Sequence, residues 1–247
     1  MEIILYSGNK PDSEDNLLNF NDLNKKNIRH NKNLFFILDF NSVNKKSAKK
    51  IIKKLLKYKR KINFGIYNKE TNEYIMAKAY NYDKNNYFHN ELISALYAIL
   101  KKDKKEMYEY IYDTVCDYLD NEFITKNACN FKDDKCGEKR NTSCTVGCCR
   151  HYKNKILGPM PFNKLVVCEH LENKRCSAKC ISCKLFTCDY LNKKGIKFKI
   201  NDIFLLDTFF NLMQKYFIKI SVYTPKDTII KRLVCLSIGK DNVKNRI

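Results

Sequence analysis

The middle of this sequence is rich in thiols that could bind metal. Ten of its 12 cysteines fall between residues 129 and 188: Cys129, Cys136, Cys144, Cys148, Cys149, Cys168, Cys176, Cys180, Cys183 and Cys188. Thiolates separated by two to four residues can reach one ion from a single turn of backbone. The N-terminus lacks the basic segment and long apolar run of a signal peptide. We therefore expect a cytoplasmic chain whose thiols stay reduced and bind metal.

The spacing is closest at the end of this segment. Four sulfurs fall within thirteen residues there: Cys176, Cys180, Cys183 and Cys188. Four thiolates suffice for a tetrahedral zinc ion or for a four-iron cluster, and the sequence leaves the choice open. The remaining cysteines could furnish a second site, in which His151 or His170 replaces one sulfur. Cys116 and Cys235 lie outside the segment, and we expect their loss to matter little.

The order of the cysteines from residue 144 to residue 188 carries a family resemblance. Gly147-Cys148-Cys149-Arg150 is followed by Cys168-Glu169-His170-Leu171, by Cys176 and by Cys183-Lys184-Leu185-Phe186. This order resembles the YkgJ-like cysteine-cluster family, in which a CxxCxxCC signature precedes a C-x2-L, an isolated Cys and a closing Cys-Arg-x-aromatic. The resemblance implies chelation of zinc or iron by the matching thiols: Cys144, Cys148, Cys149, Cys168, Cys176 and Cys183. The chain departs from the family pattern in lacking the upstream CxxC and in having Lys184 as the closing basic residue.

The charge of the chain points to a second kind of partner. Its net charge is +20, from 47 Lys and Arg against 27 Asp and Glu, and such a surplus attracts polyanions. A helix is predicted from Lys45 to about Tyr58, because apolar residues recur there at three- and four-residue steps. Its other face carries only lysines: Lys45, Lys46, Lys49, Lys50, Lys53, Lys54 and Lys57. The Lys45–Arg60 stretch is therefore either a nucleic-acid-binding face or the solvated side of a lysine-rich helix.

Hydrophobic patterning predicts an α+β fold. A small N-terminal α/β unit over 1–86 would contain a buried strand at 34–40 and a strand pair at 61–67 and 74–80. A second domain, 87–247, would be helical at 88–120 and again in its C-terminal part, from 203 to 217 and after Thr224-Pro225. The cysteine-rich metal-binding insert at 129–188 is expected to have little regular structure.

The sequence leaves the biochemical role open among three hypotheses. It contains no phosphate-binding loop, hydrolase elbow or metalloprotease helix, so no catalytic residue is predicted and enzymatic activity stays undecided. No apolar stretch is long enough to span a membrane. The hypotheses are a metal-binding protein whose cluster is structural or stores metal, a zinc-stabilised nucleic-acid-binding protein and an iron–sulfur redox protein.

Overall fold

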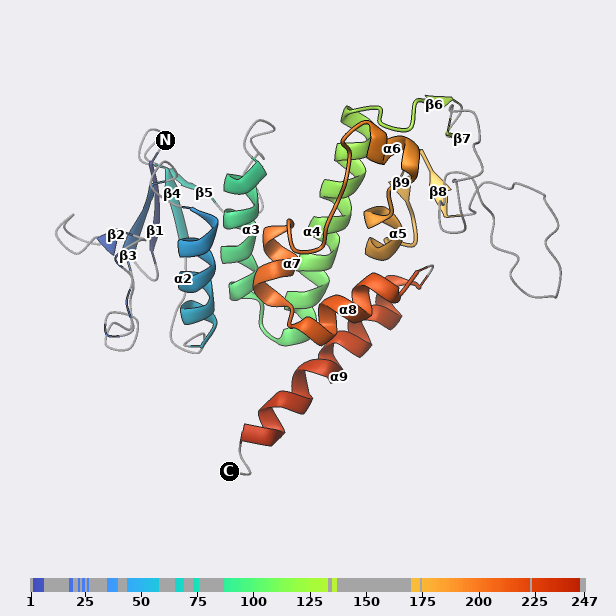
Figure 1. Ribbon diagram of the computed structural model, residues 1–247. Helices are drawn as coiled ribbons and strands as arrows, with labels where there is room; N and C mark the ends of the chain where they lie inside the picture. The colour runs from blue at the N-terminus through green and yellow to red at the C-terminus, as the bar shows by residue number, and fades with distance from the viewer. Residues whose placement is uncertain are drawn as a thin grey trace. The chain divides into compact units, whose positions relative to one another are not determined.

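The chain divides into two compact units in the computed structural model, 1–107 and 108–247 (Figure 1). The described residues are 2–6, 18–19, 22, 24, 26, 35–39, 44–57, 65–68, 73–75, 87–132, 135–136, 170–173, 175–222 and 224–244. The sequence predicted separate domains over 1–86 and 87–247, and that division stays a prediction about independent folding.

Short strands form a sheet in the first unit, in the order β2-β3-β1-β4-β5. Their bounds are Glu2–Tyr6 for β1, Leu18–Asn19 for β2, Phe35–Asp39 for β3, Gly65–Asn68 for β4 and Glu73–Ile75 for β5. The strand β1 pairs antiparallel with both β3 and β4, whereas β2 is parallel to β3. The predicted strand at 34–40 is thus confirmed by β3, and the predicted strand pair is confirmed by the antiparallel β4 and β5, with shorter bounds.

Two helices of the first unit pack against each other, the amphipathic α2 (Lys45–Lys57) and the largely buried α3 (Tyr87–Leu100). Asn44 caps α2, because its side-chain oxygen accepts a hydrogen bond from the Ser47 amide at 2.9 Å. The buried residues of α2 are those of the predicted stripe: Ala48, Ile51, Ile52 and Leu55. The helix predicted from the spacing of apolar residues is confirmed almost to the residue.

The second unit is built around α4 (Lys104–Thr125). Asp103 caps this helix, since its side chain accepts from the Glu106 amide at 2.9 Å, and the Glu106 carboxylate accepts from the Lys102 amide, one residue before the cap, at 3.1 Å. Apolar residues three and four apart form its buried face: Tyr108, Ile111, Tyr112, Val115, Leu119 and Phe123. Tyr108 and Tyr112 are therefore core residues, because their rings are buried in the interior.

Three C-terminal helices and a group of smaller elements complete this unit (Figure 1). The C-terminal helices are α7 (Phe204–Phe209), α8 (Leu212–Ile220) and α9 (Lys226–Lys244). The smaller elements are the hairpin β6 (Phe131–Lys132) and β7 (Lys135–Cys136), the hairpin β8 (Leu171–Glu172) and β9 (Arg175–Cys176), α5 (Ile181–Leu185) and α6 (Asp189–Lys193).

The C-terminal half differs from the predicted continuous helix over 203–217. The chain leaves helical geometry at Phe210, and Asn211 starts α8 with its own capping box. An asparagine that can bond the amide three residues ahead competes with continuation of the preceding helix. The helix predicted after Thr224-Pro225 is confirmed by α9, which begins at Lys226.

The predicted fold class, α+β with a small N-terminal α/β unit, is wrong. Of the residues whose side chains the structure describes, 69% are helical and 1% lie in strands. The strands of the first unit are backbone pairings of two to five residues, whereas α4 and α9 run for 22 and 19 residues. Because the buried apolar residues recur mostly at helical spacing, the packed side chains belong to helices. The described chain is mainly helical.

Candidate metal centre

The predicted ligands differ in how much of them the structure describes. Cys144, Cys148, Cys149 and Cys168 lie outside the described residues, as does His151. Cys136 and Cys176 are described by backbone alone. Each ends a two-residue strand of a hairpin, where Cys136 pairs with Phe131 and Cys176 pairs with Leu171. The side chains of the other four predicted ligands are described: Cys129, Cys180, Cys183 and Cys188.

Cys180 and Cys183 are brought together at the start of α5. Their side chains are 1% and 3% exposed, and they form one buried cluster against which Ala178 packs. Cys180 is the residue before the first turn of α5 and Cys183 lies within that turn, so the two intervening residues let both thiols face the same space. The Cys180 thiol donates to the Ser221 carbonyl at 3.2 Å. The predicted convergence of these two sulfurs is present in the structure.

The backbone before this pair is held in an unusual conformation. Lys179 has a φ of 49°, in the left-handed region that residues other than glycine rarely adopt. Two bonds to α4 hold it there. The Cys116 thiol donates to the Lys179 carbonyl at 3.1 Å, and the Lys179 ammonium donates to Asp113 at 3.0 Å. The contacts of Lys179 on α4 therefore determine the direction in which the chain enters the thiol pair.

Tyr112 attaches the first residue of α5 to the same helix. Its hydroxyl oxygen accepts a hydrogen bond from the Ile181 amide at 3.0 Å. Burial raises the pKa of the Tyr112 hydroxyl far above its ordinary value, and the nearby thiols of Cys116, Cys180 and Cys183 raise it further. The hydroxyl therefore stays protonated and neutral beside the thiol pair.

A buried ion pair fixes the far end of α5. The Lys184 ammonium donates to the Asp120 carboxylate, and the two side chains are 1% and 6% exposed. Arg175 donates to the Asn121 side chain at 2.8 Å on the same helix. The charged ends of both cations therefore bind polar groups of α4 rather than facing the sulfurs.

An acidic stripe on α4 is the functional feature that sequence reasoning missed. Asp113, Asp117 and Asp120 recur at steps of four and three residues, so they share one face of the helix. Asp113 accepts from both Lys179 and Lys226, at 3.0 and 2.9 Å. The signal was present in the sequence as three aspartates at helical spacing, close in the chain to a segment rich in Lys and Arg.

The other two predicted ligands with described side chains belong to a different cluster. Cys129 is buried with Phe123 and Leu191, and Cys188 packs against this group from the residue before α6. The four closely spaced cysteines of the sequence are therefore divided, because Cys188 turns toward the Phe123 cluster whereas Cys180 and Cys183 lie together. The six cysteines with described side chains are all thiols rather than half-cystines. In this part of the chain, no three His, Cys, Asp or Glu side chains gather closely enough to hold a metal ion.

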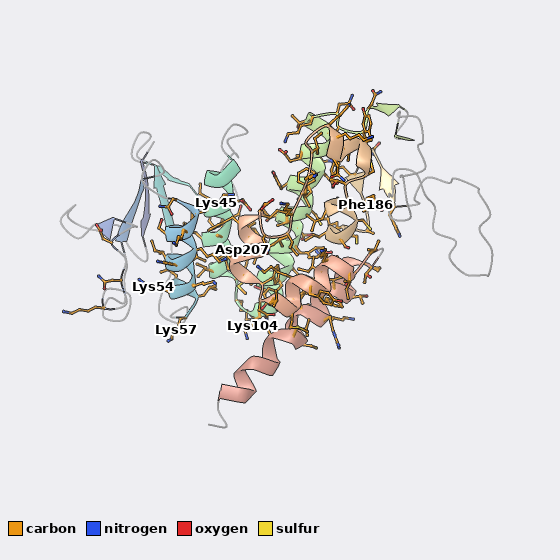
Figure 2. All side chains as sticks on the ribbon, viewed as in Figure 1. Lys45, Lys54, Lys57, Lys104, Phe186 and Asp207 are labelled. Atoms are coloured by element: carbon orange, nitrogen blue, oxygen red, sulfur yellow. The ribbon has the colours of Figure 1, made fainter. Side chains whose placement is uncertain are left out.

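The basic helix α2 presents its lysines as the sequence predicted. Lys45, Lys46, Lys50, Lys53, Lys54 and Lys57 are exposed, and Lys49 is half-buried. Figure 2 shows Lys45, Lys54 and Lys57 along this helix. No acidic residue lies in the first turn of α2. Among the described helices, none combines the length and hydrophobicity needed to cross a bilayer.

Comparison of the chain with protein-family models, with curated proteins and with solved structures found no match. Its function must therefore be inferred from its own residues.

Proposed function

We propose that this chain is a metal-binding protein whose thiols hold zinc or an iron–sulfur cluster in a structural or metal-holding role. The observation that carries the proposal is the buried contact between Cys180 and Cys183. Two thiols at Cys-x2-Cys spacing, in contact and away from water, are half of a tetrahedral sulfur site. The stored strain at Lys179, directly before the pair, is typical of a functional segment.

The donor set fits a soft metal ion, with the remaining ligands supplied by residues whose side chains are not described. Cys176 ends β9 four residues before Cys180, and the hairpin continues to Ser177, whose amide donates to the His170 carbonyl at 2.7 Å. The fourth ligand would come from the other cysteines of the segment: Cys136, Cys144, Cys148, Cys149 and Cys168. The resemblance to the YkgJ-like family, which implies several of these thiols, is part of the proposal.

Metal binding would change the chemistry of this pair in one defined way. A thiol that ligates a metal ion loses its proton, so Cys180 would give up the hydrogen bond that it donates to Ser221. The neutral Tyr112 hydroxyl and the paired Lys184 add no uncompensated charge next to the resulting thiolates. The proposal includes a cytoplasmic location, where the thiols stay reduced. It assigns no reaction to the chain.

Elemental analysis and a visible spectrum of protein purified without oxygen test this function. Stoichiometric zinc in a colourless protein identifies a zinc site, whereas iron with absorption near 400 nm, the value typical of thiolate-bound clusters, identifies a cluster. The second outcome would also revive the redox hypothesis. A protein that contains no bound metal contradicts the proposal.

A second candidate function is polyanion binding through α2. The observation that favours it is the array of exposed lysines opposite the buried stripe of Ala48, Ile51, Ile52 and Leu55. Phosphate contacts release counterions, so retention on DNA should weaken steeply with salt. Replacing Lys46, Lys50 and Lys54 by Gln should reduce the steepness of log binding constant against log salt concentration by about three. DNA binding that does not depend on salt concentration, or a salt dependence that the substitutions leave unchanged, would contradict polyanion binding by α2.

A further inference from the structure

The helix α8 presents an apolar stripe to solvent. In the part of the chain whose side chains are described, the exposed large hydrophobic residues all lie on α8 or just after it: Leu212, Met213, Tyr216, Ile220 and Val222. Leu212 is 79% exposed and Tyr216 is 59% exposed. Leu212, Tyr216 and Ile220 are four residues apart, so they follow one face of the helix. A contiguous exposed apolar group of this kind marks an interaction site.

The stripe is held on a firmly anchored helix. Asn211 and Gln214 form a reciprocal capping box at its start, with both hydrogen bonds at 3.0 Å. The Gln214 amide also donates to the Tyr108 hydroxyl and to the Leu233 carbonyl, at 3.1 and 2.8 Å. These bonds fix the inner face of α8, so the apolar residues of its outer face are held in place rather than exposed by fraying.

The helix carries lysines and no acidic residue. Of its two lysines, Lys215 is paired with Asp207 at 2.7 Å and Lys219 is exposed; beyond the helix, Lys226 is paired with Asp113 at 2.9 Å. The chain as a whole has a net charge of +20, so a second copy would be repelled, whereas an anionic surface would attract it. The net charge of the chain therefore favours an anionic occupant.

We propose that α8 docks on an anionic lipid surface, with Leu212, Met213, Tyr216 and Ile220 inserted at the level of the headgroups. The exposed face belongs to a single helix of nine residues, and a fluid bilayer surface accepts such a face without a complementary groove. Stable peripheral binding needs an apolar and a basic signal. The stripe supplies the first, and the exposed Lys219 together with the net charge of the chain supplies the second. Tyr216 suits the membrane–water interface, because its apolar ring can contact lipid while its hydroxyl stays hydrated. Because the described helices include no membrane span, the association is peripheral.

A tryptophan reporter tests insertion directly. The chain contains no Trp, so Tyr216→Trp places a unique fluorophore in the stripe. Phosphatidylcholine vesicles of which a quarter of the lipid is phosphatidylserine should shift its emission to the blue, and brominated acyl chains should quench it. Pure phosphatidylcholine vesicles should have a much smaller effect. Unshifted, unquenched emission with the phosphatidylserine vesicles overturns the proposal. A shift with poly-L-glutamate alone, or in concentrated protein without lipid, overturns it in favour of an acidic polypeptide or a second copy.

Paired variants separate apolar insertion from general attraction between charges. Leu212→Ser with Ile220→Ser leaves the net charge unchanged, and we expect partition onto the phosphatidylserine vesicles to fall at least about tenfold. Lys197→Ser with Lys199→Ser, between α6 and α7, is the matched control, which removes charge at exposed positions outside α2 and leaves the stripe intact. Far-ultraviolet circular dichroism checks that both variants fold. A control that loses as much binding as the stripe variant would refute insertion by α8. This test is independent of bound metal, so it can fail without the metal-binding proposal failing.

Discussion

Lys184 and Asp120 form an ion pair that is almost completely buried, between α5 and the C-terminal part of α4. Removing two charges from water costs several kcal/mol for each ion, and only their mutual attraction and hydrogen bond offset that cost. The pair joins the segment that carries Cys180 and Cys183 to the central helix of the second unit. It therefore couples the position of the thiols to the stability of the core.

We predict that Lys184→Met destabilises the protein by about 3–5 kcal/mol, because it leaves the Asp120 carboxylate buried without its partner. The double variant Lys184→Met with Asp120→Leu should recover most of this loss, because it removes both buried charges. Urea unfolding followed by circular dichroism measures both free energies of unfolding. A single variant as stable as the unmodified chain would contradict the burial of the pair.

The Tyr112 hydroxyl predicts a loss of stability at alkaline pH. Burial raises its pKa above the ordinary value of 10.0. Above that pH the unfolded chain releases the tyrosine proton while the folded chain retains it, so unfolding becomes more favourable as pH rises. Tyr112→Phe should unfold more readily at neutral pH, since the Ile181 amide loses its acceptor, but its stability should fall less between about pH 9 and 11. Parallel pH dependence in both proteins would contradict a protonated, buried hydroxyl.

Cys116 provides a prediction that separates hydrogen bonding from metal ligation. The sequence suggested that Cys116→Ser has little effect. The structure gives a reason for this expectation, because the serine hydroxyl can replace the thiol as hydrogen-bond donor to the Lys179 carbonyl. Cys116→Ala removes the donor and should cost about 1–3 kcal/mol. Metal content should be the same in both variants. If Cys116→Ser alone loses the metal, Cys116 is itself a ligand.

The start of α8 offers a prediction for the second unit. Asn211→Ala removes the capping box and should cost about 1 kcal/mol in the free energy of unfolding. Asn211→Asp keeps an acceptor for the Gln214 amide and should retain most of the stability. Leu212→Ala is the neighbouring control, because a side chain that is 79% exposed contributes little to the core. Equal effects of Asn211→Ala and Leu212→Ala would contradict the cap.

Local patterns in the sequence predicted the elements better than they predicted the fold class. The buried stripe of α2 could be predicted because its pattern lies within one helix. The proportion of strand to helix could not be predicted in this way, because it depends on which segments pack together in three dimensions. The pairing of Lys184 with Asp120 joins residues 64 positions apart, and such a contact follows only from the tertiary arrangement.

The same limit explains the outcome for the candidate ligands. Close spacing correctly predicted that Cys180 and Cys183 meet, because both lie at the start of one short helix. Spacing also grouped Cys188 with them, but Cys188 packs against the Phe123 cluster instead. The direction of a side chain after a break in the helix depends on what it packs against, and sequence distance carries no information on that.

The central claim is that the buried pair Cys180 and Cys183 ligates a metal ion. The most direct measurement is the ratio of bound metal to protein, determined after anaerobic purification, for Cys180→Ser with Cys183→Ser beside Cys235→Ser. Cys235 is exposed on α9, away from the pair in sequence, and serves as the matched control. We predict that the control keeps the metal content of the unmodified protein and that the double variant loses the ion. Equal metal content in the two would contradict ligation by this pair.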